Sequence, residues 1–219
     1  MKKTLMWLIM VLSSPLCCIA QSKSFNQSLA DSLAKWAVLD QTAAGIIDAR
    51  LRALGTTRLQ QYRDSVYALN GQRLKGVIRR YGFPGYDLAG KKGSHNFWLM
   101  AQHCDKDVPF QRQVLKAMKA ELPKHNADPK DYANLTDRVL LNTGQKQLYG
   151  TQLTYRTDSC QAIPKPLRDS LSVNTRRKAI GLEPIEANLN WMSQLHFDMN
   201  KAAYEKMGIH APKLLPEHP

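Results

Sequence analysis

The sequence predicts a mainly α-helical domain with one small β element, that is, a fold of the α+β class. Apolar residues recur every three to four positions along most of the chain, which is the periodicity of amphipathic helices. One segment, residues 145–155, is instead rich in aromatic and β-branched residues typical of a strand. The 219 residues contain no internal repeat, and their number suits one buried core. We therefore expect a single compact helical domain with a short strand or hairpin.

The first residues have the pattern of a cleaved signal peptide. Lys2 and Lys3 precede an apolar run over residues 5–12, and Cys18-Ile19-Ala20 provides small residues just before Gln21. The apolar run is too short to span a membrane, because a spanning helix needs about 20 apolar residues. We expect cleavage after Ala20 and therefore export, to the periplasm or to the outside of the cell.

This prediction divides the chain into a signal peptide (1–20), one domain (21–207) and a flexible C-terminal tail (208–219). A lipid anchor on Cys17 or Cys18 is disfavoured, because the residues that precede them are not the small ones expected there. No transmembrane segment is expected after cleavage.

The first half of the domain predicts three helices. Two are long and amphipathic, over residues 28–54 with a possible break near Gly45, and over residues 58–82. Residues 86–93 are expected to form a short strand or a loop. Ser94 can then cap a third helix that runs to about Cys104.

The second half starts with two helices that each carry a proline in the first turn. One begins at Asp107 or Val108, and the other at Asp128. The strand pattern over residues 145–155 follows, with Gly150 as a bulge or a close backbone approach. Two further helices are expected, over residues 169–182 and 185–207.

The chain is basic, with a formal net charge of +13 that falls to +11 without residues 1–20, since these contain two lysines and no acid. Such a surplus suggests affinity for an anionic surface such as a membrane or an envelope polymer. The alternative is that the charge only keeps the protein soluble, because the basic residues are scattered. Nucleic acid is an unlikely partner for an exported protein.

Two cysteines, Cys104 and Cys160, remain after cleavage of the signal peptide. Thiols often pair in an oxidising compartment, so a disulfide between them is one prediction. The other is a pair of separately buried thiols. The sequence leaves both open.

Polar residues on apolar helices are the main candidates for a functional site. With 100° between successive helical residues, Asp137 falls between Leu140 and Leu141, and His103 falls between Leu99 and Met100. Buried polar side chains need partners, because burying them unpaired is costly. One interpretation is a structural network. The other is a pocket in which His103 is a general base or acid and Asp137 or Asp105 orients it.

The sequence also supplies candidate ligand-binding side chains near these three. They are Gln102, Arg138, Gln147, Tyr149, Thr151 and Gln152. No HExxH motif, CxxC pair or acidic calcium loop is present, so we expect neither a metal site nor a cofactor. Cys104 is a poor candidate for a nucleophile with His103 as its base, because adjacent helical residues point about 100° apart.

The chain resembles an uncharacterised bacterial domain family of the DUF6624 type. The resemblance rests on an ordered series of motifs between about Trp36 and Trp191. They are LDQ (39–41), YGFP (81–84), FWLMAQHCD (97–105), Gln111, LTDRVLLNTGQKQLYGTQ (135–152) and NTRRKAIGLEPI (174–185). The resemblance implies one domain and directs attention to the same polar residues and to Gly150. It implies no activity.

Three hypotheses for function follow. The first is an exported domain that binds a small polar or anionic ligand, or a cell-envelope partner, through the His/Asp/Gln/Tyr cluster. The second is an exported hydrolase with His103 as general base. The third is a purely structural polar network in an interaction domain. We place the first ahead because it requires least of the sequence, and whether the protein is an enzyme stays open.

Overall fold

The computed structural model describes residues 24–44 and 55–216, which form seven α-helices, two short 3-10 turns and one two-stranded sheet. The helices are α1 (Gln27–Ala43), α3 (Thr56–Tyr81), α4 (Tyr86–Gln102), α5 (Val108–Glu121), α6 (Pro129–Asn142), α7 (Val173–Lys178) and α8 (Ile185–Lys206). The strands are β1 (Leu153–Arg156) and β2 (Gln161–Pro164). The predicted class, a mainly helical single domain with a small β element, is confirmed.

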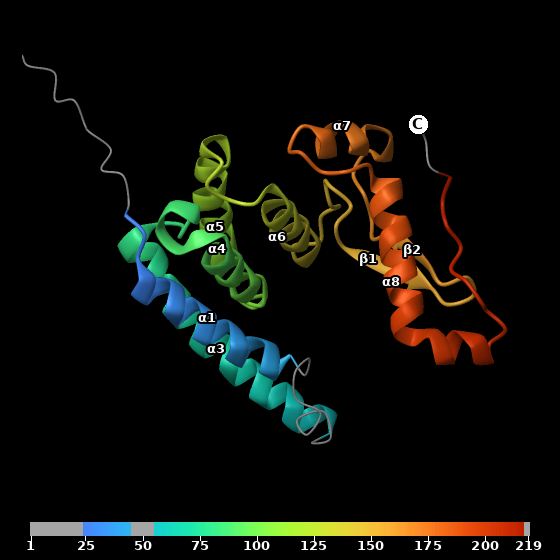
Figure 1. The fold of residues 1–219 in the computed structure, drawn as a ribbon, viewed down its shortest axis with the longest axis horizontal. Coiled ribbons are helices and arrows are strands. Elements are labelled where there is room, and N and C mark those ends of the chain that lie inside the picture. Colours follow the sequence, from blue (N-terminus) through green and yellow to red (C-terminus); the bar gives the residue numbers. More distant parts are fainter. Residues whose placement is uncertain (1–23, 45–54, 217–219) are drawn as a thin grey trace, which may run out of the picture.

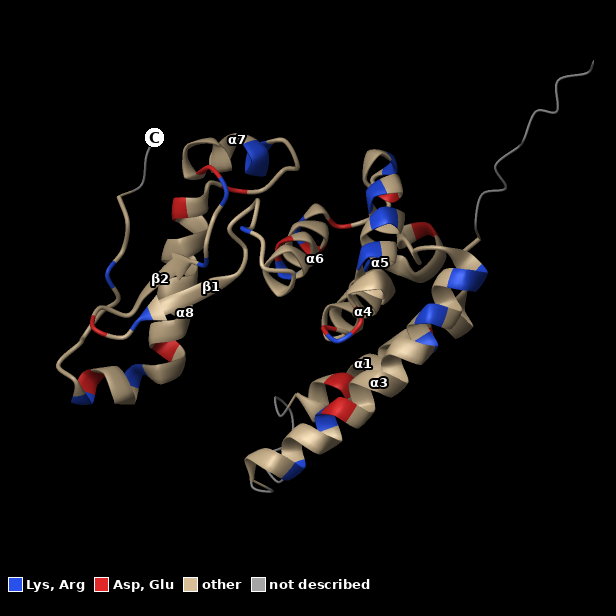
Figure 2. Cartoon of the chain, turned by 180° about the vertical axis from the view of Figure 1, so that it is seen from behind, with Lys and Arg blue, Asp and Glu red and all other residues tan. Residues whose placement is uncertain are grey.

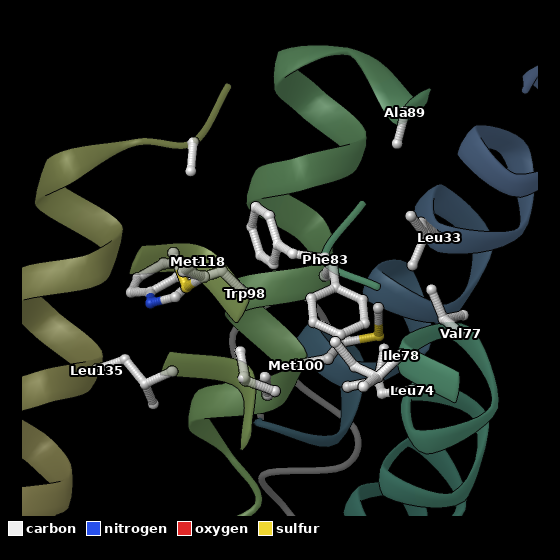
Figure 3. Packing of buried hydrophobic residues seen from close by; sticks show 14 of the residues in the cluster. Leu33, Leu74, Val77, Ile78, Phe83, Ala89, Trp98, Met100, Met118 and Leu135 are labelled. Atoms are coloured by element: carbon white, nitrogen blue, oxygen red, sulfur yellow. The ribbon is translucent and has the colours of Figure 1, made fainter. Parts of the chain in front are cut away.

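Helix α4 lies at the centre of the N-terminal part and packs against α1, α3, α5 and α6 (Figure 1). Its side chains Phe97 and Met100 are fully buried in the largest apolar cluster. Figure 3 shows Leu33 of α1 and Leu74 of α3 on one side of this cluster and Leu135 of α6 on the opposite side. Burial of this apolar surface is the main force that holds the five helices together.

Side-chain caps fix the starts of α5 and α6 as predicted. The carboxylate of Asp107 accepts a hydrogen bond from the backbone N–H of Phe110 at 3.1 Å. Asp128 accepts from the N–H of Lys130 at 2.7 Å. Each satisfies a backbone donor that has no partner inside its own helix.

Residues 86–93 are helical, so the prediction of a strand or loop there is wrong. The side chain of Asn126 accepts from the N–H of Asp87 at 2.9 Å and stabilises the first turn of α4. Gly90 has the non-helical angles φ 70° and ψ 168° and introduces a kink into α4. Because of this kink, the sequence does not show one continuous helical periodicity over the segment. Ser94 consequently lies inside α4, where it is buried, rather than at its cap.

The C-terminal part consists of the β hairpin, α7 and α8 (Figure 1). Strand β2 packs on α8, and the N–H of Ala162 donates to Ser193 Oγ at 2.8 Å. The predicted strand is confirmed only from Leu153 onward, because the backbone before it bonds to a side chain of α6, as shown below. The predicted helix over 169–182 shortens to α7, preceded by a 3-10 turn over Ser170–Ser172.

Cys104 and Cys160 are free thiols, so the disulfide is not formed and the alternative of two separate buried thiols holds. Cys104 belongs to the large cluster around α4, and Cys160 packs with Phe197 and Tyr204 near α8. The predicted signal peptide and the possible break near Gly45 lie outside the described residues. Among the helices that are described, none is long and apolar enough to cross a membrane.

Candidate functional site

A cavity of about 610 Å³ opens between α3 and the segment that follows α4. We call it the pocket. Its lining side chains are polar or charged for the most part. They are Gln60, Arg63, Asp64, Tyr67, Ala68, Gly71, Gln72, Lys75, His103, Cys104, Asp105, Lys106, Asp107 and Arg138.

His103 is held in the wall of the pocket by Asp40. It stands at the C-terminal cap of α4, and its Nδ1 lies 2.7 Å from Oδ1 of Asp40. Asp40 is fully buried on α1, and Asn70 of α3 donates to its Oδ2 at 3.3 Å. A carboxylate accepts only, so Nδ1 carries a proton and Nε2 keeps its lone pair in the neutral ring.

The ring of His103 is also fixed by an aromatic neighbour. Tyr67 of α3 stacks on it with ring centroids 4.6 Å apart and planes 20° from parallel. Burial, together with the negative charge of Asp40, raises the pKa of Tyr67 to about 12. The phenol therefore stays protonated at neutral pH and is a hydrogen-bond donor at the pocket.

Three acids of the pocket are already paired with bases. Asp105 accepts from Nε of Arg138 at 2.7 Å and from a second guanidinium nitrogen, as a bidentate pair. Burial opposes ionisation of Asp105, but the bonds and charge of Arg138 together with the bonds from Gln111 and Asn142 outweigh it and lower the pKa of the carboxyl. The other two pairs are Lys75 with Asp107 and Lys106 with Asp64.

Arg63 is the basic side chain of the pocket that has no acidic partner among the described residues. Its long hydrogen bonds, both of 3.4 Å, go to the carbonyl of Ala43 and to Gln60. Among the described residues, the pocket thus has three internal ion pairs, one cation without an acidic partner and one imidazole whose second nitrogen has no partner.

Asp137 belongs to a second polar centre, in which it holds the loop between α6 and β1. This aspartate is fully buried and accepts from the N–H groups of Leu148 at 2.7 Å, Tyr149 at 3.0 Å and Thr151 at 2.9 Å. The hydroxyl of Thr151 adds a bond of 3.0 Å. A carboxylate surrounded by donors in this way satisfies the loop backbone that would otherwise be buried unpaired.

Two glutamine side chains form further hydrogen bonds with the backbone of the same loop and its neighbours. Gln147, fully buried, donates to the carbonyls of Gln152 at 3.0 Å and Lys165 at 2.8 Å, and accepts from the N–H of Gln152 at 3.0 Å. Gln152 donates to the carbonyl of Asn134 at 3.4 Å. We call Asp137, Gln147, Tyr149, Thr151 and Gln152 the loop cluster. None of the five lines the pocket.

With both centres described, the chain can be compared with known proteins. Residues 29–197 match the family of unknown function DUF6624. The chain belongs to this family. No curated protein and no solved structure matches it. The matched region of the DUF6624 domain includes the whole pocket and the whole loop cluster.

The structure of this DUF6624 domain divides the predicted site into two. It brings His103, Asp105 and Arg138 together at the pocket, and it places Asp137, Gln147, Tyr149, Thr151 and Gln152 in the loop cluster. The carboxylate that orients His103 is Asp40, not Asp137 or Asp105, because the oxygens of those two are taken by the loop backbone and by Arg138. Thr151 lines a different, smaller cavity of about 230 Å³.

Gln102 ends α4 next to the pocket but does not line it. Its backbone carbonyl accepts from Nε2 of Gln111 at 3.1 Å, and the same amide group reaches Asp105 at 3.4 Å. Gln111 thereby supports the segment that carries His103. It is fully buried.

The sequence reasoning missed Asp40, Tyr67 and Asn70 as parts of the site. A signal for Asp40 was available, because it continues the buried stripe of α1 at helical spacing. The buried residues of that helix are Leu29, Leu33, Ala37, Asp40 and Ala43. An acid on an apolar stripe is the same anomaly that singled out Asp137.

The chemistry of the pocket points away from a cysteine nucleophile. Burial raises the pKa of Cys104 to about 12, with the charge of Asp107 adding to it, so its thiol is not a nucleophile at neutral pH. Within residues 24–44 and 55–216, no group of three or more His, Cys, Asp or Glu side chains is arranged to hold a metal ion.

Proposed function

We propose that this protein is exported and that the pocket binds a small polar ligand, with Nε2 of His103 as the central contact. The observation that carries the proposal is the pairing of His103 with Asp40. A fully buried carboxylate holds one ring nitrogen at 2.7 Å, while the other nitrogen belongs to a side chain in the wall of a cavity. Burying a carboxylate costs free energy, and here it orients an imidazole toward open space.

The size and charge of the pocket define the class of ligand. About 610 Å³ lies within the range of small-molecule sites. The three ion pairs at its wall leave Arg63 as the cation that has no acidic partner among the residues that the structure describes. A ligand with several negative charges would meet too little positive charge, so an uncharged or singly anionic polar molecule fits best. Arg63 is placed to receive one carboxylate or similar group.

Hydrolysis is the second candidate function, and one observation favours it. A buried carboxylate that holds Nδ1 of a histidine is the arrangement of a general base with its orienting group. Because the thiol of Cys104 stays protonated, the base would act on water. Nε2 of His103 would take a proton from a water molecule whose oxygen attacks an electrophilic carbon of the ligand. The bond from that carbon to the leaving group would then break, and the leaving group would take the proton from Nε2.

Export is supported by the basic and apolar pattern of residues 1–20. Fractionation of cells that produce the full chain, with the N-terminus of the product sequenced, tests it. An N-terminus at Gln21 outside the cytoplasm is the expected result. An intact leader on cytoplasmic protein would contradict export and leave the pocket proposal standing.

The ligand proposal is tested by thermal unfolding of the parent protein in the presence of small polar compounds from a library. The same measurement is made with each compound on the His103→Gln variant. A ligand at 100 times its Kd adds about 2.7 kcal/mol to the free energy of unfolding. We expect compounds that stabilise the parent and not His103→Gln.

The matched control is His95→Gln. His95 also pairs with an aspartate, Asp131, at 2.9 Å, but it lies outside the pocket. Compounds that stabilise His95→Gln and His103→Gln equally would contradict the proposal. Product formation from any such compound, present in the parent and absent in His103→Gln, would favour the hydrolase over the binding protein.

A further inference from the structure

A second hollow, unlike the pocket, runs between the first half of α1 and the last half of α3. It is a groove of about 590 Å³. Its lining residues are Asn26, Ser28, Leu29, Ser32, Trp36, Arg73, Gly76, Val77, Arg80 and Tyr81. Figure 2 shows Lys and Arg along the length of α3, and Arg73 and Arg80 of its second half line the groove.

The positive charge of the groove is not neutralised. None of the described residues that line it is acidic. The two acids of α1 are occupied elsewhere, because Asp31 receives a bond from Gln27 at 2.8 Å and Asp40 holds His103. The groove therefore keeps the two charges of Arg73 and Arg80, in contrast to the pocket, where three acids pair with three bases.

Both guanidinium groups are held against aromatic rings. Arg73 lies over Trp36 at 5.2 Å from the ring centroid, and Arg80 lies over Tyr81 at 5.1 Å. Arg73 donates one further bond, to Asn70 at 3.3 Å, and Arg80 makes no hydrogen bond or ion pair with a described residue. A stacked guanidinium keeps its edge N–H groups available, and its side chain is already partly ordered.

Gly76 leaves the floor of the groove open between the two arginines. It lies three residues after Arg73 and four before Arg80, which places all three on one face of α3. A Cβ at this position would have no atom within 4 Å, so packing does not require a glycine. Glycine inside a helix is unfavourable compared with alanine, so helix stability does not account for Gly76, and the space beside it stays open.

The spacing of the arginines defines the ligand. Seven residues along a helix correspond to about 10 Å, and each guanidinium is kept near its own ring, so one small anion cannot pair well with both. We propose that this groove binds a linear chain with repeated phosphoryl groups, one at Arg73 and another at Arg80. The fork of N–H groups in arginine matches phosphate oxygens, and Ser28 places a further hydroxyl in the lining of the groove.

The test is titration of the purified full chain with long-chain inorganic polyphosphate, with orthophosphate, and with phosphatidylglycerol vesicles. We expect saturable binding of polyphosphate and weak binding of orthophosphate. Arg73→Gln and Arg80→Gln should each weaken polyphosphate binding about tenfold or more, as expected for loss of a charged hydrogen-bonding partner.

Arg79→Gln is the matched control. It removes the same charge from the neighbouring position, and Arg79 is exposed and does not line the groove. We expect it to change polyphosphate affinity less than twofold. A loss equal to that of Arg80→Gln would overturn the proposal, since it would mean attraction by net charge alone. The proposal would also be overturned if orthophosphate bound as tightly as polyphosphate, or if the protein bound only to the vesicles.

Gly76→Leu tests the groove without a change of charge. It should fill the floor and abolish polyphosphate binding, while the helical circular dichroism and the Tm stay at or above the parent values. Unchanged polyphosphate binding in a folded Gly76→Leu protein would mean that polyphosphate does not bind in this groove. His103→Gln should bind polyphosphate like the parent, so this proposal and that for the pocket can fail separately.

Discussion

Asp137 and Asp40 are both fully buried acids on otherwise apolar helix faces, yet their surroundings differ in kind. The oxygens of Asp137 meet donors of one loop only, and every partner ends inside the fold. Asp40 holds an imidazole whose second nitrogen has no partner among the described residues and whose ring lines a cavity. Burial of an acid shows that partners exist. In a structural centre, every partner of the acid is itself bonded inside the fold. In a site, a partner of the acid still has a polar atom at a cavity.

The largest effect on stability is expected at Asp137. In Asp137→Ala the backbone donors of Leu148, Tyr149 and Thr151 lose their acceptor inside the fold. Removing one partner of such a buried charged network costs about 3–5 kcal/mol. Chemical denaturation measures this free energy of unfolding, and the Tm should fall in parallel.

Asp31→Ala is the control, because Asp31 is an exposed acid on a helix with a single bond from Gln27. It should change the free energy of unfolding by less than about 0.5 kcal/mol. A loss below about 1 kcal/mol for Asp137→Ala would mean that the loop does not depend on the carboxylate, and the contrast between the two acids would disappear.

A smaller loss is expected from Gly150→Ala, which disturbs the loop cluster through the backbone. Gly150 has φ 71°, and an added Cβ would lie 2.4 Å from Cδ1 of Ile185. Left-handed strain and this overlap together should cost about 1–3 kcal/mol. Gly144→Ala is the matched variant, with φ 73° and no atom within 4 Å of the added Cβ. If both cost the same, the overlap with Ile185 contributes nothing.

The pocket should respond in the opposite way, with a modest loss of stability and a large loss of ligand binding. His103→Ala leaves Asp40 with its bonds from Asn70 and Gln41, and the loss of one hydrogen bond to a charged acceptor costs about 1.5–3 kcal/mol. Any ligand found for the parent should then fail to stabilise the variant. The structural hypothesis instead requires ligand stabilisation, if any exists, to survive His103→Ala.

Much of the fold was predictable because periodicity and capping are local. The starts of α5 and α6 follow from Asp107 and Asp128, whose side chains cap backbone N–H groups no more than three residues away. The start of α4 was not predictable, since it depends on Asn126, which is 39 positions away from Asp87. The strand was overextended for a similar reason. The N–H groups of Leu148, Tyr149 and Thr151 bond to Asp137 rather than to another strand.

For the site, residue chemistry identified the anomalous polar residues but not their partners. His103, Asp105 and Arg138 do meet at the pocket, whereas Asp137 does not join them. Helical geometry places side chains on a face of their own helix and says nothing about which helix lies opposite. The partner of His103 is 63 positions earlier in the sequence, on α1, and only tertiary packing brings the two together.

The smallest effect concerns Asp105, the partly exposed acid of the pocket. Its pKa is lowered in the folded protein, so the unfolded chain binds its proton first as the pH falls. The resulting stabilisation is present above the unfolded value, near 4, and is lost as the pH falls through the folded value. Because 40% of the side chain is exposed, we expect about 0.5–1 kcal/mol.

Asp105→Asn should therefore be less stable than the parent at pH 7 and nearly equal to it at pH 3, as measured by urea denaturation across this range. Arg138→Gln should flatten the same part of the profile, because it removes the cation that lowers the pKa. A variant profile parallel to that of the parent would show that the ion pair contributes nothing to folding. The pairing of Asp105 with Arg138 would then serve only to arrange charge around the ligand, which would bring this acid closer to Asp40 in role than to Asp137.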